Sequence, residues 1–325
     1  MMCRYRNMKR WRRSLLEKGN KFIEKWMAFV TPLCMLVGIS FPDVAAHGLP
    51  YVTMVFAFIT FTGALKSEFK DVLRVFHDPK PLLCMLVMIH VVIPAVACGA
   101  GHLFFGSDPY AITGMVLEFS VPTAVVGLMW VTIYNGNNPL SLSLVVIDTI
   151  LSPFLIPVTL RVLVGSQVEI DATMMMRQLI FMVALPAIAA MVLNQVTHGA
   201  VKNTWPKKLA LFSKFALMFV VTSNSSKVAP YVRHMNLERV AIGAAILVLA
   251  TGSYALGWGV ARVLHQDKET TISMIYGTGM RNISAGAVIA GACFPGAVMY
   301  PVMIGTLFQQ VLAAFYGKVL VSKLE

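Results

Sequence analysis

Charged residues are scarce in this chain. Only 13% of its 325 residues are charged and 57% are hydrophobic, whereas soluble domains are about a quarter charged and about half apolar. This shortage excludes an ordinary soluble domain. Apolar runs recur along the whole length, each close to the ~20 helical residues that cross the ~30 Å core of a bilayer. They predict an all-α polytopic membrane protein with ten transmembrane helices. The predicted spans are residues 26–41, 49–65, 81–104, 109–134, 138–164, 174–196, 208–229, 237–264, 268–294 and 297–319.

Acidic residues are scarcer than basic ones, with 15 Asp and Glu against 27 Lys and Arg, which gives a net charge of +12. The basic surplus lies mainly in the N-terminal segment and in alternate loops, a pattern of membrane topology rather than of nucleic-acid binding. It predicts a multi-pass protein of a plasma or inner membrane with both termini in the cytoplasm. We expect residues 1–25 to form an interfacial helix on an anionic lipid surface, not a signal peptide, and residues 320–325 to form a cytoplasmic tail.

Signatures of enzymes and metal proteins are missing. The five cysteines are scattered without CxxC or Cys/His spacing, and we find no HExxH, no GxSxG and no acid/base pair on one helix face. The sequence therefore predicts neither an enzyme nor a cofactor. The expected partners are the lipid bilayer and a small molecule, with no nucleic acid. Nothing in the sequence indicates the oligomeric state.

Two of the predicted spans are interrupted near their middles. The fourth contains Pro122, and the ninth contains Gly277 and Gly279. Proline removes a backbone donor and glycine weakens a helix, so both favour a break. Such kinks can serve packing alone, but matched breaks in two halves point to a transporter's binding site. Each half, residues 26–165 and residues 166–319, holds five spans with the interrupted one fourth, which predicts inverted repeats whose broken helices cross.

Three segments resemble the bile acid:sodium symporter family. The second and third spans of that family are similar to FAFITFTGALKSEFKDVLRVFHDPKPLLCMLVMIHVVIPAVACGAGHLFF, its fifth to NGNNPLSLSLVVIDTILSPFLIPVTLRVLVG, and its ninth to GTGMRNISAGAVIAGACFP. The resemblance covers about residues 26–319. It implies a panel domain of spans 1, 2, 6 and 7 and a core domain of spans 3–5 and 8–10. Small organic anions would move between these domains by alternating access, coupled to sodium.

Most of the sodium ligands that this resemblance implies are absent. A hard cation needs oxygen ligands, which the family supplies where its broken helices cross. The family's Glu-x-Gly-Met-Gln-Asn is here Gly-Thr-Gly-Met-Arg-Asn at residues 277–282, so Gly277 replaces a carboxylate and Arg281 a glutamine. The other positions where the family has an oxygen ligand and this chain does not are Ile89, Val126, Gly127 and Val145, while Ser141 remains. We expect weakened or lost sodium coupling and a degenerate sodium site.

Arg281 would lie in the middle of the ninth span. An ionised arginine at that depth costs about 3 kcal/mol on insertion scales, so it needs a partner or a cavity. The candidate partners are Glu118 and Asp148. In one hypothesis Arg281 supplies a fixed charge in place of sodium and pairs with one of these carboxylates. In another it binds an anionic substrate bidentately beside half-helix N-termini, and the two hypotheses are compatible.

The remaining candidates lie near the expected crossing. The other expected substrate contacts are Gly279, Met280, Asn282, Pro122, Thr123 and Gln310. The family has an oxygen ligand one residue before His90, which we interpret as a packed membrane histidine rather than a proton carrier. Asp148 would couple transport to protons if Arg281 left its charge partly uncompensated.

The predicted function is secondary active transport of a small organic anion. One alternative is a transport-silent membrane sensor or scaffold that retains the fold. Another is a fully sodium-coupled symporter with a rebuilt ion site. Bile acids, keto acids, pantoate-like acids and sulfated compounds are all compatible with the residues, and so are sodium, protons or no coupling ion.

Overall fold

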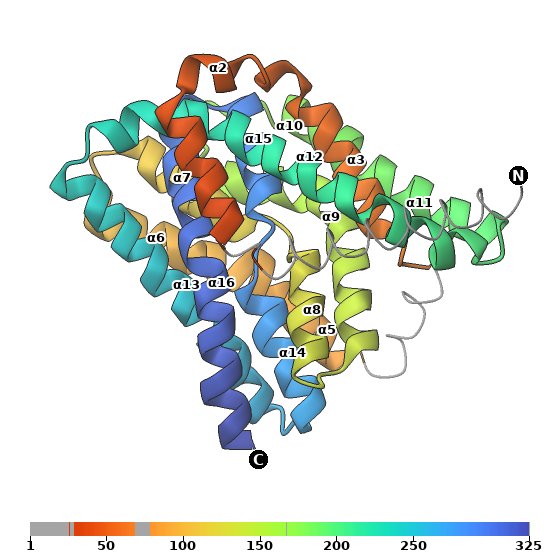
Figure 1. Cartoon of the computed structure of the whole chain (residues 1–325). Coiled ribbons are helices and arrows are strands. Elements are labelled where there is room, and N and C mark those ends of the chain that lie inside the picture. Colours follow the sequence, from red (N-terminus) through yellow and green to blue (C-terminus); the bar gives the residue numbers. More distant parts are fainter. Residues whose placement is uncertain (1–25, 27–28, 69–78, 167, 325) are drawn as a thin grey trace, which may run out of the picture.

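The computed structural model describes residues 26, 29–68, 79–166 and 168–324 of the chain. All regular structure within these residues is helical, apart from one isolated antiparallel bridge between Thr123 and Arg281. Seven helical segments in this part of the chain are long and apolar enough to cross a membrane (Figure 1). They are Pro42–Ala64, Lys80–Phe105, Asn138–Val164, Ala172–Val196, Ala200–Arg233, Leu237–Val263 and Gly296–Val319. The predicted all-α membrane architecture is confirmed at this level. The interfacial helix predicted for residues 1–25 lies outside the described residues.

The other predicted spans are shorter or interrupted. The first is the helix Phe29–Ser40. The fourth is divided into α7 (Pro109–Ser120) and α8 (Val125–Ile133), and the ninth into α14 (Lys268–Gly279) and α15 (Ile283–Cys293). Each interruption lies inside its predicted span.

The long segments contain the remaining elements. They are α2 (Pro42–Ala46), η1 (Leu49–Tyr51), α3 (Val52–Ala64), α5 (Lys80–Val87), η3 (Met88–Val92), α6 (Ile93–Phe105), α9 (Asn138–Val164), α10 (Ala172–Leu179), η4 (Ile180–Ala184), α11 (Leu185–Val196), α12 (Ala200–Arg233), α13 (Leu237–Val263) and α16 (Gly296–Leu324). The elements η3 and η4 are single π-helical turns. Helix α16 continues through Leu324, over most of the stretch predicted as a tail.

Short polar side chains begin many of these helices. Asp108 accepts hydrogen bonds from the amides of Tyr110 and Ala111 at the start of α7. The side chains that cap α9, α10, α13, α14 and α15 in the same way are Asn137, Asp171, Asn236, Asp267 and Asn282. The first amides of a helix lack partners within it, so these caps fix where each helix begins.

The two interruptions have different local causes. Val121 is extended at the end of α7, since a residue that precedes proline avoids the helical region. In the ninth span the predicted break falls at the glycines, but both glycines are helical and the break lies at residues 280–282. Their role is close packing: a Cβ on Gly279 would lie 2.3 Å from the ring of Tyr254, and one on Gly277 would lie 2.7 Å from Leu144.

One face of α9 shows how the bundle meets lipid. Phe154, Val158 and Val162 lie four residues apart, on one side of the helix, and all three are exposed. Elsewhere on the same helix Asp148, Ser152 and neighbouring apolar groups are buried. An apolar exterior around a partly polar interior is the arrangement expected where hydrocarbon is the solvent.

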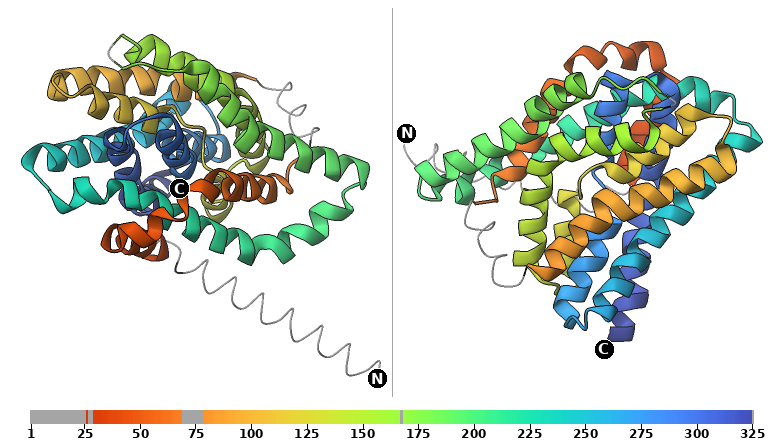
Figure 2. Two further views of the ribbon diagram at one scale, coloured as in Figure 1. Left: turned by 90° about the horizontal axis from the view of Figure 1, so that it is seen from above. Right: turned by 180° about the vertical axis from the view of Figure 1, so that it is seen from behind.

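The helices form two groups, and the members of each group pack on one another. Helix α12 packs along α2 and α3, and α11 packs on α3. In the other group α7 packs on α6 and α16, and α13 packs on α14. Seen from above, α12 runs along one side of the molecule (Figure 2, left). The interruptions at 121–124 and 280–282 lie in the second group.

Candidate functional site

The two interruptions are hydrogen-bonded to each other. The amide of Ala124 donates to the carbonyl of Met280 at 3.1 Å, and the amide of Asn282 donates to the carbonyl of Pro122 at 2.8 Å. Between these bonds lies the antiparallel bridge of Thr123 and Arg281. A break inside an apolar interior leaves backbone groups without helical partners, and the crossing satisfies them reciprocally.

Thr123 links this crossing to the helices around it. Its hydroxyl donates to the carbonyls of Gly277 and Met280, at 3.0 and 3.2 Å, at the end of α14. Its amide donates to Oδ2 of Asp148 on α9 at 2.6 Å. A single residue of the first interruption therefore contacts both α9 and the second interruption.

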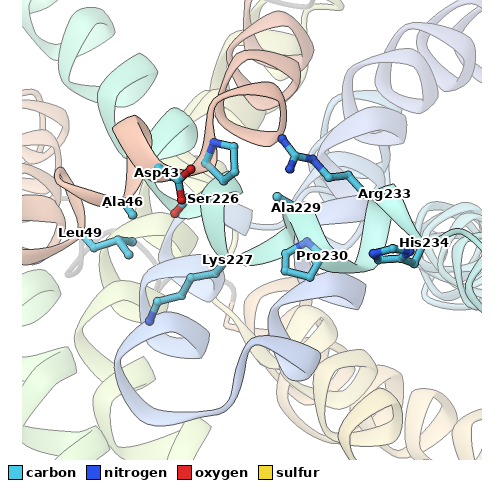
Figure 3. A pocket seen from close by; sticks show the side chains of 10 residues that line it. Asp43, Ala46, Leu49, Ser226, Lys227, Ala229, Pro230, Arg233 and His234 are labelled. Atoms are coloured by element: carbon cyan, nitrogen blue, oxygen red, sulfur yellow. The ribbon is translucent and has the colours of Figure 1, made fainter.

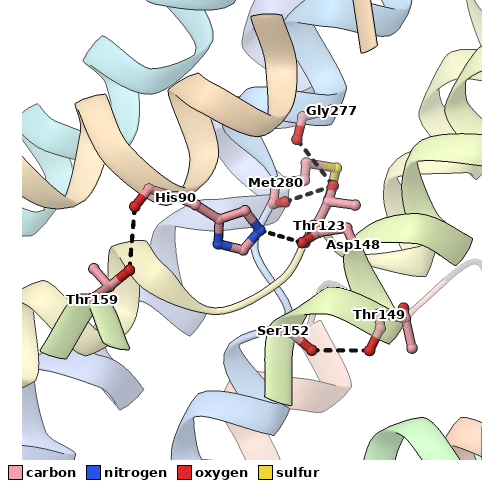
Figure 4. Close-up of polar contacts among 8 residues, drawn as sticks. All are labelled: His90, Thr123, Asp148, Thr149, Ser152, Thr159, Gly277 and Met280. Atoms are coloured by element: carbon pink, nitrogen blue, oxygen red, sulfur yellow. Dashed lines mark hydrogen bonds and ion pairs between the residues drawn. The ribbon is translucent and has the colours of Figure 1, made fainter. Parts of the chain in front are cut away.

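Asp148 is paired with His90. Nε2 of His90 lies 2.7 Å from Oδ1 of Asp148, and the two side chains are 5% and 0% exposed. His90 lies in the π-helical turn η3, which is followed by Pro94. Because proline has no amide hydrogen, the carbonyl of His90 lacks a donor four residues ahead, and the hydroxyl of Thr159 donates to it at 3.3 Å (Figure 4). Sequence analysis missed this pair, which only the relative rotation of the two helices reveals.

Arg281 is fully enclosed, at 2% exposure. Its amide donates to Oε1 of Gln309 on α16 at 3.1 Å, but its three guanidinium nitrogens have no acceptor among the described residues. Arg281 interacts electrostatically with Asp148 and Glu118. Neither carboxylate forms an ion pair with it in the described part of the chain, where Asp148 pairs with His90 instead.

Glu118, near the end of α7, is the second carboxylate of this region. It is 3% exposed, and its Oε2 has no hydrogen-bond partner among the described residues. It packs against Gly305 of α16, where an added Cβ would lie 2.2 Å from Oε1. Glu118 and Arg281 thus interact electrostatically in the interior, without a hydrogen bond between them among the described residues.

The family assignment follows from comparisons with known proteins. A model of the Sodium Bile acid symporter family matches residues 53–234. "Uncharacterized protein YbaS" of Bacillus subtilis (strain 168) is 38% identical over 294 residues, which are 90% of this chain and 96% of that protein. The chain belongs to the sodium bile acid symporter family. The predicted resemblance is confirmed.

More distant relatives carry transport names. The "Uncharacterized sodium-dependent transporter YocS" of B. subtilis (strain 168) is 23% identical over 87% of this chain and 88% of its own length. The "Probable sodium/metabolite cotransporter BASS1, chloroplastic" of Arabidopsis thaliana is 23% identical over 84% of this chain and 70% of its own length. This chain is thus a multi-pass membrane protein of a transporter family, which implies a small-molecule substrate and is consistent with the absence of enzyme signatures.

Positions where the sodium bile acid symporter family is expected to bind sodium line one small cavity beside the crossing. Its volume is about 10 Å³, close to the least that holds one water molecule. The lining includes Gly127, Ser141, Val145 and Gly277. Ser141 is buried and its hydroxyl has no partner among the described residues. With glycine and valine at the other three positions, this set fits a sodium ion poorly, because a hard cation requires several oxygen ligands.

Aromatic rings fill the space next to this cavity. Trp130, Tyr134 and Tyr276 stack on one another with centroids 6.0 to 6.2 Å apart. Nε1 of Trp130 donates to Oε1 of Gln310 at 3.1 Å. The predicted Gln310 therefore binds the indole of Trp130. The adjacent Gln309, which the sequence analysis did not select, binds the amide of Arg281 at the crossing.

A second, larger cavity of about 440 Å³ lies between α2 and α12 (Figure 3). Lys227, Arg233 and Asp43 are among its lining residues. Both cations already bind carbonyl groups: Lys227 donates to Gly291 of α15 at 2.5 Å, and Arg233 donates to the last residues of the helix Phe29–Ser40. None of the predicted site residues lines this cavity.

Proposed function

We propose that the protein is a secondary transporter of a small organic anion that works by alternating access, with Arg281 as a fixed positive charge and with sodium coupling lost. The observation that carries this proposal is the buried guanidinium of Arg281, which has no hydrogen-bond acceptor among the described residues and is next to the crossing of two broken helices. A buried cation without acceptors is costly, so the site favours a ligand that brings them.

The architecture supports movement of this kind. We infer two inverted repeats of five helices, because the interrupted helix is fourth in each half and the two interruptions meet in antiparallel fashion. We further infer that the helix Phe29–Ser40, α2, η1, α3, α10, η4, α11 and α12 form the panel, and that the remaining helices form the core. Arg281 belongs to the core, so a movement of the panel relative to the core would expose Arg281 to water. Both termini would then face the cytoplasm, in keeping with the basic N-terminal segment.

The chemistry of Arg281 favours a carboxylate or a sulfate-type group. A guanidinium presents its N–H donors in a planar fork that matches two oxygens of such an anion. Asn282 starts α15 directly beside it, and the positive end of a helix dipole adds attraction for an anion. The expected contacts at Met280, Pro122 and Thr123 surround the same crossing.

A test compares Arg281→Gln with the wild type in thermal-stability and uptake assays. Pyruvate and taurocholate serve as a small and a large anionic probe. If either probe stabilises the wild type, Arg281→Gln should lose that stabilisation while it retains its own folded state. Equal stabilisation of both proteins would reject the role of Arg281. Absence of flux for either probe in proteoliposomes of folded protein would favour a sensor or scaffold.

The loss of sodium coupling is tested separately. The melting temperature of the purified protein should be the same in sodium chloride and in choline chloride. A saturable, sodium-specific rise would show that the protein still binds sodium, and would support a sodium-coupled symporter with a rebuilt ion site.

A further inference from the structure

We propose that the buried pair of His90 and Asp148 is a proton-binding site at the crossing of the broken helices, and that its proton serves as the coupling ion. The coupling role rests on the proposed transport function, whereas the binding site does not. No residue of the pair is an oxygen ligand that the family resemblance assigns to sodium.

Burial singles this pair out. Among the described residues, the acidic and basic side chains that are buried are Glu118, Asp148, Arg281 and His90. Acidic and basic residues inside a membrane protein are rare and commonly mark ion or proton pathways. Histidine is the member of this group whose ordinary titration falls near neutral pH.

The hydrogen bonds identify the atom that would receive the proton. Asp148 accepts from Nε2 of His90 and from the amide of Thr123. A carboxylate can only accept, so Nε2 carries the hydrogen and Nδ1 of the neutral ring keeps its lone pair. Nδ1 is buried and has no partner among the described residues. A proton from water binds this lone pair and forms an N–H bond. The ring becomes an imidazolium, and Asp148 remains ionised beside it.

The surrounding charges make proton and anion binding cooperative. Asp148 and Glu118 both interact with Arg281. A monoanion that binds at Arg281 adds one negative charge to this group, whatever the state of Glu118, and a proton on His90 cancels that charge. Each ligand then raises the affinity for the other by the same factor.

The other charged groups on the elements packed around the pair lie at the surface. They are Lys80 on α5, His102 on α6, Arg161 on α9, Arg177 on α10, and Lys268 and Glu269 on α14, and all are exposed. Tyr276 of α14 and Tyr254 of α13 are buried nearby and remain neutral in the ordinary pH range. Among the described residues of these elements, the charge next to the pair therefore depends on the four buried side chains.

The pair is also connected to the crossing of the broken helices. Asp148 holds the amide of Thr123, and Thr123 holds the end of α14 through two carbonyls. When His90 is protonated, part of the negative charge of Asp148 is drawn to the imidazolium and its bond to Thr123 weakens. The π-helical turn that carries His90 is an element often found at functional sites.

Hydrogen exchange of the purified protein in lipid nanodiscs, from pH 5 to pH 8.5 and corrected for intrinsic rates, tests the site without any substrate. Peptides that cover 118–126 and 278–284 should change protection in one step. His90→Gln and Asp148→Asn should remove the step. The matched controls, His102→Gln on the same transmembrane segment and Asp108→Asn at the cap of α7, should retain it. A wild type without a step overturns the proposal, as does a step that survives in His90→Gln.

Uptake into proteoliposomes tests the coupling role, again with pyruvate and taurocholate. A proton gradient at zero membrane potential should drive uptake, and His90→Gln should reduce it about tenfold, within the range typical of coupling between sites. Uptake driven only by a sodium gradient overturns the coupling role. An exchange step without flux of either probe supports the proton site and counts against the transport function.

Discussion

Gly279→Ala tests how closely the crossing is packed. An added Cβ would lie 2.3 Å from Cγ and Cδ1 of Tyr254, far inside the ~3.5 Å at which carbon atoms make favourable contact. The ring of Tyr254 is buried and stacks on Tyr316 with centroids 4.8 Å apart. The Tyr254 atoms nearest to the new methyl group are where the ring joins the rest of the side chain. A small rotation of the ring therefore cannot relieve the clash.

The expected magnitude follows from two opposing effects. Overpacking of a core costs up to about 3 kcal/mol, and alanine gains about 1 kcal/mol over glycine inside a helix. The net destabilisation of Gly279→Ala is therefore about 2 kcal/mol. Gly259→Ala on α13 is the matched control, since its Cβ would meet no atom within 4 Å. That variant should be neutral or more stable by up to about 1 kcal/mol.

Thermal unfolding of both variants in detergent measures the difference. Gly279→Ala should melt several degrees below the wild type, since 1 kcal/mol corresponds to roughly 2–4 °C in domains of 150–250 residues. Gly259→Ala should melt at the wild-type temperature or slightly above it. Equal melting temperatures for the two variants would refute the reasoning that α14 requires glycine for close approach to Tyr254.

Three further substitutions probe individual contacts. Asn282→Ala removes the cap that accepts from the amide of Ala285 and should cost about 1 kcal/mol in denaturation experiments, whereas Asn282→Asp should retain most of the stability. Thr159→Val leaves the carbonyl of His90 without its donor and should lower the melting temperature by an amount equivalent to about 1 kcal/mol. Trp130→Phe keeps the ring stack but loses the indole bond to α16, so unfolding should show a loss of about 1 kcal/mol.

The broad fold could be predicted because it depends on local rules. A run of apolar residues fixes a membrane helix, and Pro122 fixes the interruption of the fourth span, since neither depends on distant residues. The end of α14 is different. Gly277 and Gly279 weaken a helix in isolation, yet both are helical, at places where neighbouring side chains leave no room for a Cβ. Here tertiary packing outweighs propensity.

The location of the site is easier to predict from the sequence than the hydrogen-bond partners of the residues within it. The positions of Asp148, Glu118 and Arg281 within their spans, together with the family resemblance, indicate that all three lie near one crossing. That Asp148 would pair with His90 depends on how α9 and the π-helical turn are rotated about their axes, and the sequence pattern does not contain this angle. The same reason explains why Gln309, rather than its neighbour Gln310, reaches the amide of Arg281.

The position of Arg281 has a consequence for the energetics of a transport cycle. A sodium ion that neutralises a site is carried across the membrane and dissociates on the other side. Each sodium ion released in this way contributes the free energy of its electrochemical gradient to transport. The guanidinium is attached to the chain and returns with it. Whatever work the membrane voltage does on it in one half of the cycle, about 2.3 kcal/mol per elementary charge and 100 mV, is undone in the other half. A charge that is attached to the chain can therefore stabilise the bound anion. Transport of the anion against its gradient must be driven by a coupling ion that binds on one side of the membrane and dissociates on the other.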